Sequence, residues 1–306
     1  MRQTAEYTQE ARRPTPPLVF RGPPLCAKLS AFKRTHAQGF MTALLPSLLA
    51  ALLYLAASTH QGIAFKRRQT PNQRLLGGLG LLALLAQSTA LQQQLLGGNG
   101  LTLDFFNAAS LIAASVIGIT LLANLRMPVS NLFLLLFPLG ALTTLLAQWA
   151  PTGTSQPINE QGGILAHILL SITAYGLLTL AVFQSLLLLI QDHQLKHKHP
   201  SGLIRNFPPL QTMESLLFSF LLAGWLLLSL SLLSGWIYVD NLFGQHLAHK
   251  TILSCFAWVV FAVLLWGRHQ LGWRGHTAIR WTLAGFLLLM LAYFGSKLVR
   301  EFILHI

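Results

Sequence analysis

The sequence predicts an all-α membrane protein, a polytopic bundle of about eight transmembrane helices. Hydrophobic residues make up 53% of the 306-residue chain and charged residues only 9%, whereas roughly a quarter of a soluble domain is charged. Apolar stretches of about 20 residues, the length that crosses a hydrocarbon core as a helix, recur along the chain. A helix satisfies its own backbone N–H and C=O groups, so each stretch can lie in lipid.

The first four spans are expected in the first half of the chain. They cover residues 41–58, 75–96, 105–125 and 132–149. The first span has the length of a signal-peptide core and ends in small residues, so a cleaved signal peptide is an alternative. The basic run Lys66-Arg67-Arg68 just beyond it favours a retained span with a cytoplasmic end.

The other four spans follow at similar spacing. They cover residues 164–190, 216–239, 251–266 and 281–302. Short polar or basic loops separate them, which is the pattern of a helical membrane domain over residues 41–306.

Residues 1–40 form a basic, Pro-rich tail without apolar periodicity, and we expect this tail to be disordered. Met41 opens the first apolar run directly. Our hypothesis is that translation starts at Met41 and that the tail is a misassigned extension.

The basic residues of the loops predict the orientation of the bundle. If the loop after the first span is cytoplasmic, both ends of the bundle lie outside. The inside loops then hold Lys66, Arg67, Arg68, Arg74, Arg126, Lys196, Lys198, Arg205, Arg268, Arg274 and Arg280. The outside set beyond the tail holds Lys250, Lys297 and Arg300. The net charge of +13 therefore indicates membrane orientation and lipid contact, and we expect no nucleic-acid partner.

Residue types that build other kinds of site are sparse. Cys26 and Cys255 lie far apart without CxxC spacing, so we expect neither a disulfide nor a thiolate metal site. The histidines at positions 193, 197 and 199 lie among lysines, which is typical of a basic loop near anionic lipid. Hydrolase, P-loop and dinucleotide motifs are absent, and only six acidic residues follow residue 40, so we expect no enzyme.

Polar side chains inside the spans carry the functional signal, because lipid makes them costly. His167, Ser171 and Tyr175 recur every four residues and share one helix face near the predicted outer end. The simplest interpretation of His167 is a buried histidine that bridges helices. The alternative is an axial haem ligand.

The predicted outer loop after the sixth span offers partners for such a ligand. Trp236 and Asp240 lie at its start, and His246 and His249 follow three residues apart. Two neutral imidazoles across a cleft can ligate haem iron, with Trp and Tyr rings such as Tyr175 stacked on the porphyrin. We therefore consider His167 with His249 or His246 as iron ligands. The alternatives are solvated loop histidines and a helix-end carboxylate at Asp240.

Two parts of the chain resemble a known family. Residues 165–175 read LAHILLSITAY, and residues 235–243 read GWIYVDNLF. With GWRG at 272–275 and AYFGS at 292–296, they are similar to the cytochrome c assembly family (CcsA and CcmC), most of all to its inner-membrane YpjD branch, which is related to HemX. The resemblance covers the chain from residue 41 onward.

The resemblance implies a haem-handling protein of the bacterial inner membrane that binds haem at the extracytoplasmic face for cytochrome c maturation, with an assembly protein as partner. His167 matches the family's first outer histidine, and His305 lies near the second. Trp236 and Asp240 match the ends of the family's tryptophan-rich loop, although the run of tryptophans is missing. Gln87 stands where a buried histidine of the assembly factors is expected.

Two other functions remain open on the residues alone. A small-solute or ion transport protein could use polar helix faces as a path, although no string of ionisable residues lies at mid-membrane depth. An accessory or structural subunit without haem would need only the helical bundle.

Overall fold

A computed structural model describes residues 25–67, 69–96, 104–149, 162–196, 207–238 and 248–295. Within these ranges, the side chains of residues 25–41, 96, 248 and 249 fall outside the description. The described residues are helical apart from short connections, and eight helices are long and apolar enough to cross a membrane. The prediction of an all-α bundle with about eight spans is confirmed.

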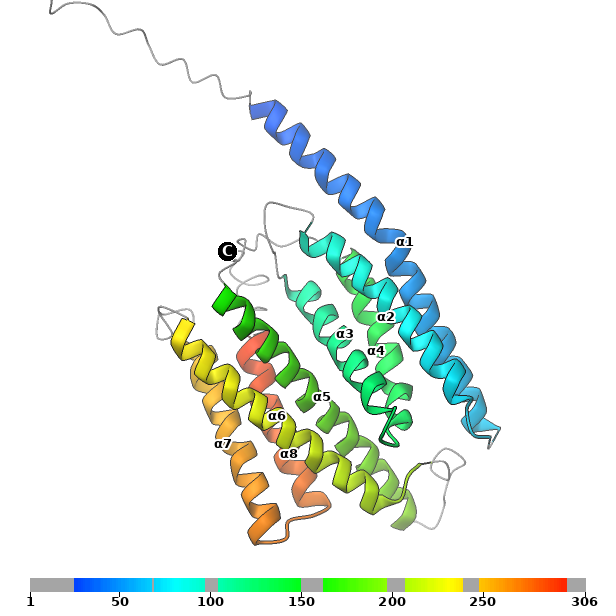
Figure 1. Cartoon of the computed structure of the whole chain (residues 1–306), viewed down its shortest axis with the longest axis vertical. Coiled ribbons are helices and arrows are strands. Elements are labelled where there is room, and N and C mark those ends of the chain that lie inside the picture. Colours follow the sequence, from blue (N-terminus) through cyan, green and yellow to red (C-terminus); the bar gives the residue numbers. More distant parts are fainter. Residues whose placement is uncertain are drawn as a thin grey trace, which may run out of the picture.

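The helices form two groups of four (Figure 1). The first group contains α1 (Leu25–Lys66), α2 (Gln73–Leu96), α3 (Phe105–Ala123) and α4 (Phe133–Trp149), which follows the short 3₁₀ helix η1 (Ser130–Leu132). The second contains α5 (Gly162–Lys196), α6 (Leu210–Tyr238), α7 (Ala248–Gln270) and α8 (His276–Met290), which continues into the π-helix η3 (Leu291–Gly295). Helix α3 packs against α5 and joins the groups.

Small residues allow the helices to approach closely, as is usual where lipid supplies no hydrophobic drive between helices. A Cβ at Gly224 of α6 would lie 2.8 Å from Cγ of Leu178 and 3.3 Å from its backbone nitrogen on α5. In the first group, a Cβ at Gly140 would lie 2.6 Å from Ile117. Because backbone and buried side chains occupy these spaces, a larger residue would separate the helices.

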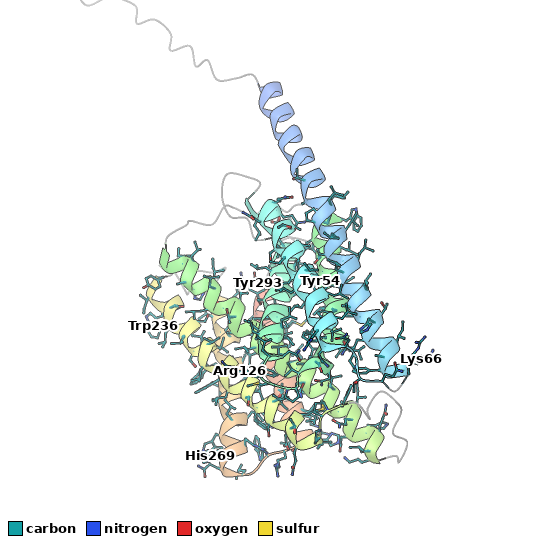
Figure 2. The ribbon with its side chains drawn as sticks, turned by 45° about the vertical axis from the view of Figure 1, so that its right-hand side comes forward. Tyr54, Lys66, Arg126, Trp236, His269 and Tyr293 are labelled. Carbon is teal, nitrogen blue, oxygen red and sulfur yellow. The ribbon has the colours of Figure 1, made fainter. Side chains whose placement is uncertain are left out.

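Successive helices run in opposite directions, so the bundle has two distinct ends. We call one the basic end: α1 finishes there at Lys66, α5 at Lys196 and α7 at Gln270, and α8 begins there at His276. The opposite end, where α5 begins and α6 finishes, is the His167 end. Figure 2 shows Lys66 and His269 toward the first of these and Trp236 toward the second.

A buried ion pair connects the helices at the basic end. The Glu214 carboxylate of α6 lies 3.3 Å from Nη1 of Arg268 on α7 and 3.4 Å from Nε of Arg274 in the connection to α8. The Arg268 guanidinium also donates to the Trp273 carbonyl and lies over the Phe218 ring. These contacts explain why α6 begins at Leu210 rather than at the expected 216: the charge of Glu214 has partners.

Helix α1 differs from the expected arrangement. It begins at Leu25, so residues 25–40, which we expected to be disordered, are helical and continuous with the first span. No proline interrupts this stretch, and an existing helix extends without a new nucleation cost. Residues 1–24 lie outside the described residues, and the start of translation at Met41 stays a prediction.

Candidate functional site

His167 lies in the second turn of α5, and its ring faces the last turns of α6. The ring atom Nδ1 is 2.9 Å from the backbone carbonyl oxygen of Ser231 and 3.0 Å from the Ser234 hydroxyl. A carbonyl oxygen can only accept a hydrogen bond, so Nδ1 carries the proton in the neutral ring. The other ring atom, Nε2, then presents a lone pair.

A chain of hydroxyl groups supports this arrangement. Ser171 donates to the backbone carbonyl of His167 at 2.7 Å, and its oxygen lies 2.7 Å from the Ser231 hydroxyl. Ser234 donates to the Ser231 carbonyl at 2.9 Å, so its oxygen is left to accept from Nδ1 of His167. Every hydroxyl in this cluster has a partner, and together they fix the ring against α6.

Two glycines permit the close crossing of α5 and α6 at this end. A Cβ at Gly235 would lie 3.0 Å from Cε1 of His167 and 3.4 Å from Nδ1. A Cβ at Gly163 would lie within the space of the Tyr238 ring, so this ring covers the first turn of α5. Gly163 of α5 therefore lies under the Tyr238 ring of α6, and Gly235 of α6 lies under the His167 ring of α5. Gly235 is thus part of the site.

The geometry of His167 is compatible with metal binding through Nε2. Histidine ligands to metals almost always donate their second ring N–H to a carbonyl, carboxylate or water, which fixes the tautomer. The Ser231 carbonyl has this role here, and no described residue donates a hydrogen bond to Nε2. The described residues contain no group of three or more His, Cys, Asp or Glu side chains around a common point. The described residues therefore offer a single histidine here rather than a closed set of metal ligands.

The other predicted site residues are placed differently. Trp236 is 78% exposed at the end of α6, beside Gly235 and at the margin of the bundle (Figure 2). Tyr175 is buried two turns deeper on α5, about 12 Å along the helix from His167. Its ring packs on Phe286 of α8, at 5.3 Å between centroids, and on Phe294 of η3, at 5.9 Å. The structure therefore does not bring Tyr175 to the His167 ring.

Asp240 and His246 lie outside the described residues, as does His305. His249 is in the first turn of α7, and only its backbone is described. The pairing of His167 with His249 or His246 therefore stays a prediction.

A second polar cluster lies inside the first group of helices. The Tyr54 hydroxyl donates to Oε1 of Gln87 at 2.8 Å, and Nε2 of Gln87 donates to the hydroxyl and carbonyl oxygens of Ser110 at 3.0 and 3.1 Å. All three side chains are buried, and the cluster joins α1, α2 and α3. Gln87 was singled out from the sequence, but Tyr54 was not, because a tyrosine in an apolar run has the pattern of an ordinary core residue.

The fold and the site define a class of protein: a polytopic α-helical membrane protein with an oriented histidine at one end of its second helical group. The model of the family described as "Cytochrome C assembly protein" matches residues 75–304. The chain belongs to this family, and the resemblance stated from its motifs is confirmed.

Three relatives show how the similarity is distributed. Inner membrane protein YpjD of Escherichia coli (strain K12) is 32% identical over 225 residues, which is 73% of this chain and 85% of YpjD. Protein HemX of Brevibacillus brevis is 23% identical and covers 81% of this chain and 93% of HemX. Cytochrome c biogenesis protein CcsA of Chlamydomonas reinhardtii is 24% identical over 47% of this chain and 40% of CcsA. No solved structure matches the chain.

Proposed function

We propose that this protein binds haem at the extracytoplasmic face of the bacterial inner membrane and takes part in cytochrome c maturation, with His167 as an axial iron ligand. The observation that carries the proposal is the hydrogen bond from Nδ1 of His167 to the Ser231 carbonyl, which leaves Nε2 as the metal-binding atom. Membership of the cytochrome c assembly family and the name of the relative CcsA support a role in this process.

The charge distribution supports the orientation. The loops of the basic end hold most of the Lys and Arg residues beyond the tail, and such loops lie in the cytoplasm. His167 would then lie at the extracytoplasmic end, where cytochrome c acquires haem. The name of the relative YpjD, an inner membrane protein, supports this location.

The proposed activity is binding and delivery. Haem iron supplies redox chemistry when it is bound, and the chain supplies position: the α5–α6 crossing orients one imidazole, and the serine cluster fixes its tautomer. Trp236, Asp240, His246 and His249 lie on the segment that follows this crossing, and we propose that they complete the haem site. An assembly protein would receive or supply the haem.

Absorption spectroscopy tests the proposal. The detergent-purified protein is supplemented with haem and compared with His167→Ala, and with His269→Ala as a control, since His269 is exposed at the basic end. We expect a Soret band for the wild type and for His269→Ala, and its loss or shift for His167→Ala. Imidazole added to His167→Gly should restore the band, because it replaces only the missing ring.

A wild-type protein without a Soret band after haem supplementation would exclude the haem function. A co-purified partner in that case would instead favour an accessory subunit.

A further inference from the structure

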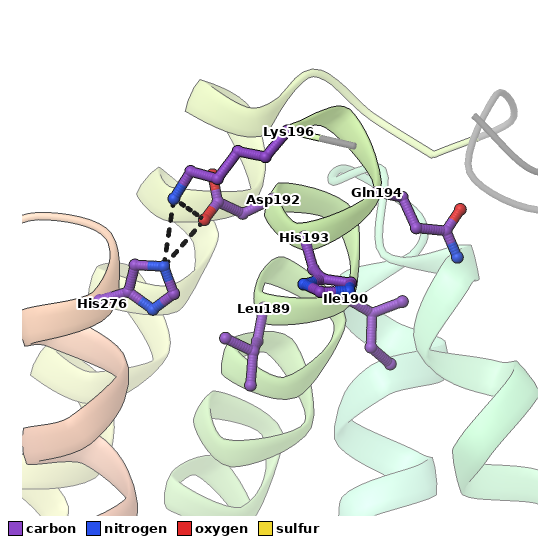
Figure 3. A pocket seen from close by; sticks show the side chains of 7 residues that line it. All are labelled: Leu189, Ile190, Asp192, His193, Gln194, Lys196 and His276. Carbon is purple, nitrogen blue, oxygen red and sulfur yellow. Dashed lines mark hydrogen bonds and ion pairs between the residues drawn. The ribbon is translucent and has the colours of Figure 1, made fainter. Parts of the chain in front are cut away.

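A pocket of about 370 Å³ lies at the basic end, against the last two turns of α5 and the first turn of α8. It is lined by Leu189, Ile190, Asp192, His193, Gln194, Lys196 and His276. Figure 3 shows Lys196, Asp192 and His276 on one side of α5, Ile190 and Gln194 on the other, and His193 between them. The His167 site is at the opposite end of α5, so this pocket has no part in the proposed haem function.

One carboxylate holds a lysine and a histidine of the pocket together. Oδ2 of Asp192 accepts from Nζ of Lys196 at 2.7 Å and pairs with Nε2 of His276 at 3.0 Å. Nζ of Lys196 also lies 3.3 Å from Nε2 of His276, so of the three N–H donors of the ammonium group at least one is left for a further acceptor. The side chains of Lys196 and His276 remain 60% and 54% exposed, so both can meet a further anion.

The pocket changes from apolar to charged along α5. Ile190 is exposed and lies six residues before Lys196, or about 9 Å along the helix axis. Leu189 lines the pocket at the same depth. On α8, the exposed Arg280 is one turn from His276, on the same helix face and farther from the basic end. An arginine at this depth extends its guanidinium toward the headgroups.

We propose that this pocket binds the phosphate headgroup of an anionic phospholipid in the leaflet at the basic end. Lys196 and Arg280 supply the positive charge, His276 supplies a ring nitrogen for hydrogen bonding, and Leu189 with Ile190 contacts the first part of an acyl chain. Asp192 acts as a positioning residue that holds Lys196 and His276 together. Basic pockets between transmembrane helices are the usual sites for such headgroups. The carboxylate of Asp192 balances Lys196 within the lining, and Arg280 beside the pocket adds the positive charge that favours an anionic headgroup.

Thermal unfolding of the full chain in nanodiscs tests this proposal. Phosphatidylcholine discs are compared with discs containing one third phosphatidylglycerol, for the wild type and for Lys196→Gln/His276→Gln. We expect phosphatidylglycerol to raise the wild-type Tm by several degrees and the double variant to lose at least half of this rise. Lys66→Gln is the matched control, because Lys66 is exposed at the same end, on α1, and it should keep the full rise.

Each other outcome would overturn the proposal. An equal rise in wild type and double variant would mean that phosphatidylglycerol acts without this pocket. An equal loss in Lys66→Gln would mean that only the total charge of the basic end matters. Glycerol phosphate, added to wild type in phosphatidylcholine discs, should leave Tm unchanged, and a rise would assign the pocket to a soluble phosphate. The variants are also compared with wild type in phosphatidylcholine alone, so that a folding defect is measured separately.

Discussion

Replacement of Gly235 by alanine should weaken haem binding without removing the ligand. The new Cβ would lie 3.0 Å from Cε1 of His167, whereas carbon atoms in ordinary contact are about 3.5 Å apart or more. The ring must therefore retreat by about 0.5 Å. If it moves directly away from α6, the 2.9 Å contact from Nδ1 to the Ser231 carbonyl lengthens to roughly 3.4 Å, beyond the usual limit for an N–H···O hydrogen bond.

The expected loss of haem affinity follows from the role of this hydrogen bond, which orients the His167 ring. Loss of a hydrogen bond that orients a metal-binding histidine typically lowers affinity by about 10-fold to 100-fold. Because Gly235→Ala stretches the bond rather than deletes the partner, we expect a change near the lower value, about 10-fold. A spectroscopic titration of the purified protein with haem measures this change as a rise in Kd.

Gly162→Ala is the matched control for this titration. Gly162 lies at the same end of the bundle, and a Cβ there would meet nothing within 4 Å. The Kd of this variant should equal that of the wild type. If Gly235→Ala also bound haem with the wild-type Kd while His167→Ala lost it, the claim that the α6 backbone orients the ring would be wrong.

Two further predictions concern the stability of the bundle. Tyr54→Phe leaves Oε1 of Gln87 buried without its 2.8 Å donor, and it should lower the free energy of unfolding by about 0.6 to 1.7 kcal/mol, measured by reversible unfolding in detergent. At the basic end, Arg268→Gln should destabilise more than Arg274→Gln, for which we expect less than about 1 kcal/mol. Both arginines pair with Glu214, but the side chain of Arg268 is 27% exposed and that of Arg274 is 59% exposed. The reverse order in the same assay would contradict this assignment.

The spans could be predicted because one physical requirement dominates them. A segment in lipid must be apolar, helical and about 20 residues long, and all three properties are visible in the sequence. Helix ends were harder to predict, because the expected spans cover only the apolar stretches. Helices α6 and α8 begin before the expected positions 216 and 281, so they include the charged residues Glu214 and Arg280. A buried ion pair accommodates the first charge, and such a pair has no local signature.

The start of α1 was also expected too late in the chain. The Pro-rich composition of residues 1–24 was extended to the whole tail, whereas the segment from Leu25 to Phe40 contains no proline and joins an existing helix. Composition averaged over forty residues concealed this change. A break placed at the last proline of the tail would have predicted the helix start correctly.

At the candidate site, helical spacing predicted that His167 and Ser171 share a face, and both do contact α6. The spacing did not predict Ser231 and Ser234 as partners, although these serines stand three residues apart in an apolar run, which is a usable signal. Tyr175 shares the face of His167 in sequence, but its ring packs against Phe286 of α8. Helix α5 contacts both α6 and α8, so residues on one face can meet different neighbours. Which neighbour covers each turn of a helix depends on tertiary packing.

The hydrogen bond of His167 bears on the two interpretations that the sequence left open. A half-buried histidine can bridge two helices through one ring nitrogen and leave the other without a protein partner. Here both contacts of Nδ1 go to α6, and no described residue hydrogen-bonds Nε2. Bridging therefore uses one nitrogen and determines the tautomer that leaves the other nitrogen able to bind iron. Under the proposed function, the contact that stabilises the α5–α6 crossing would also orient the ligand.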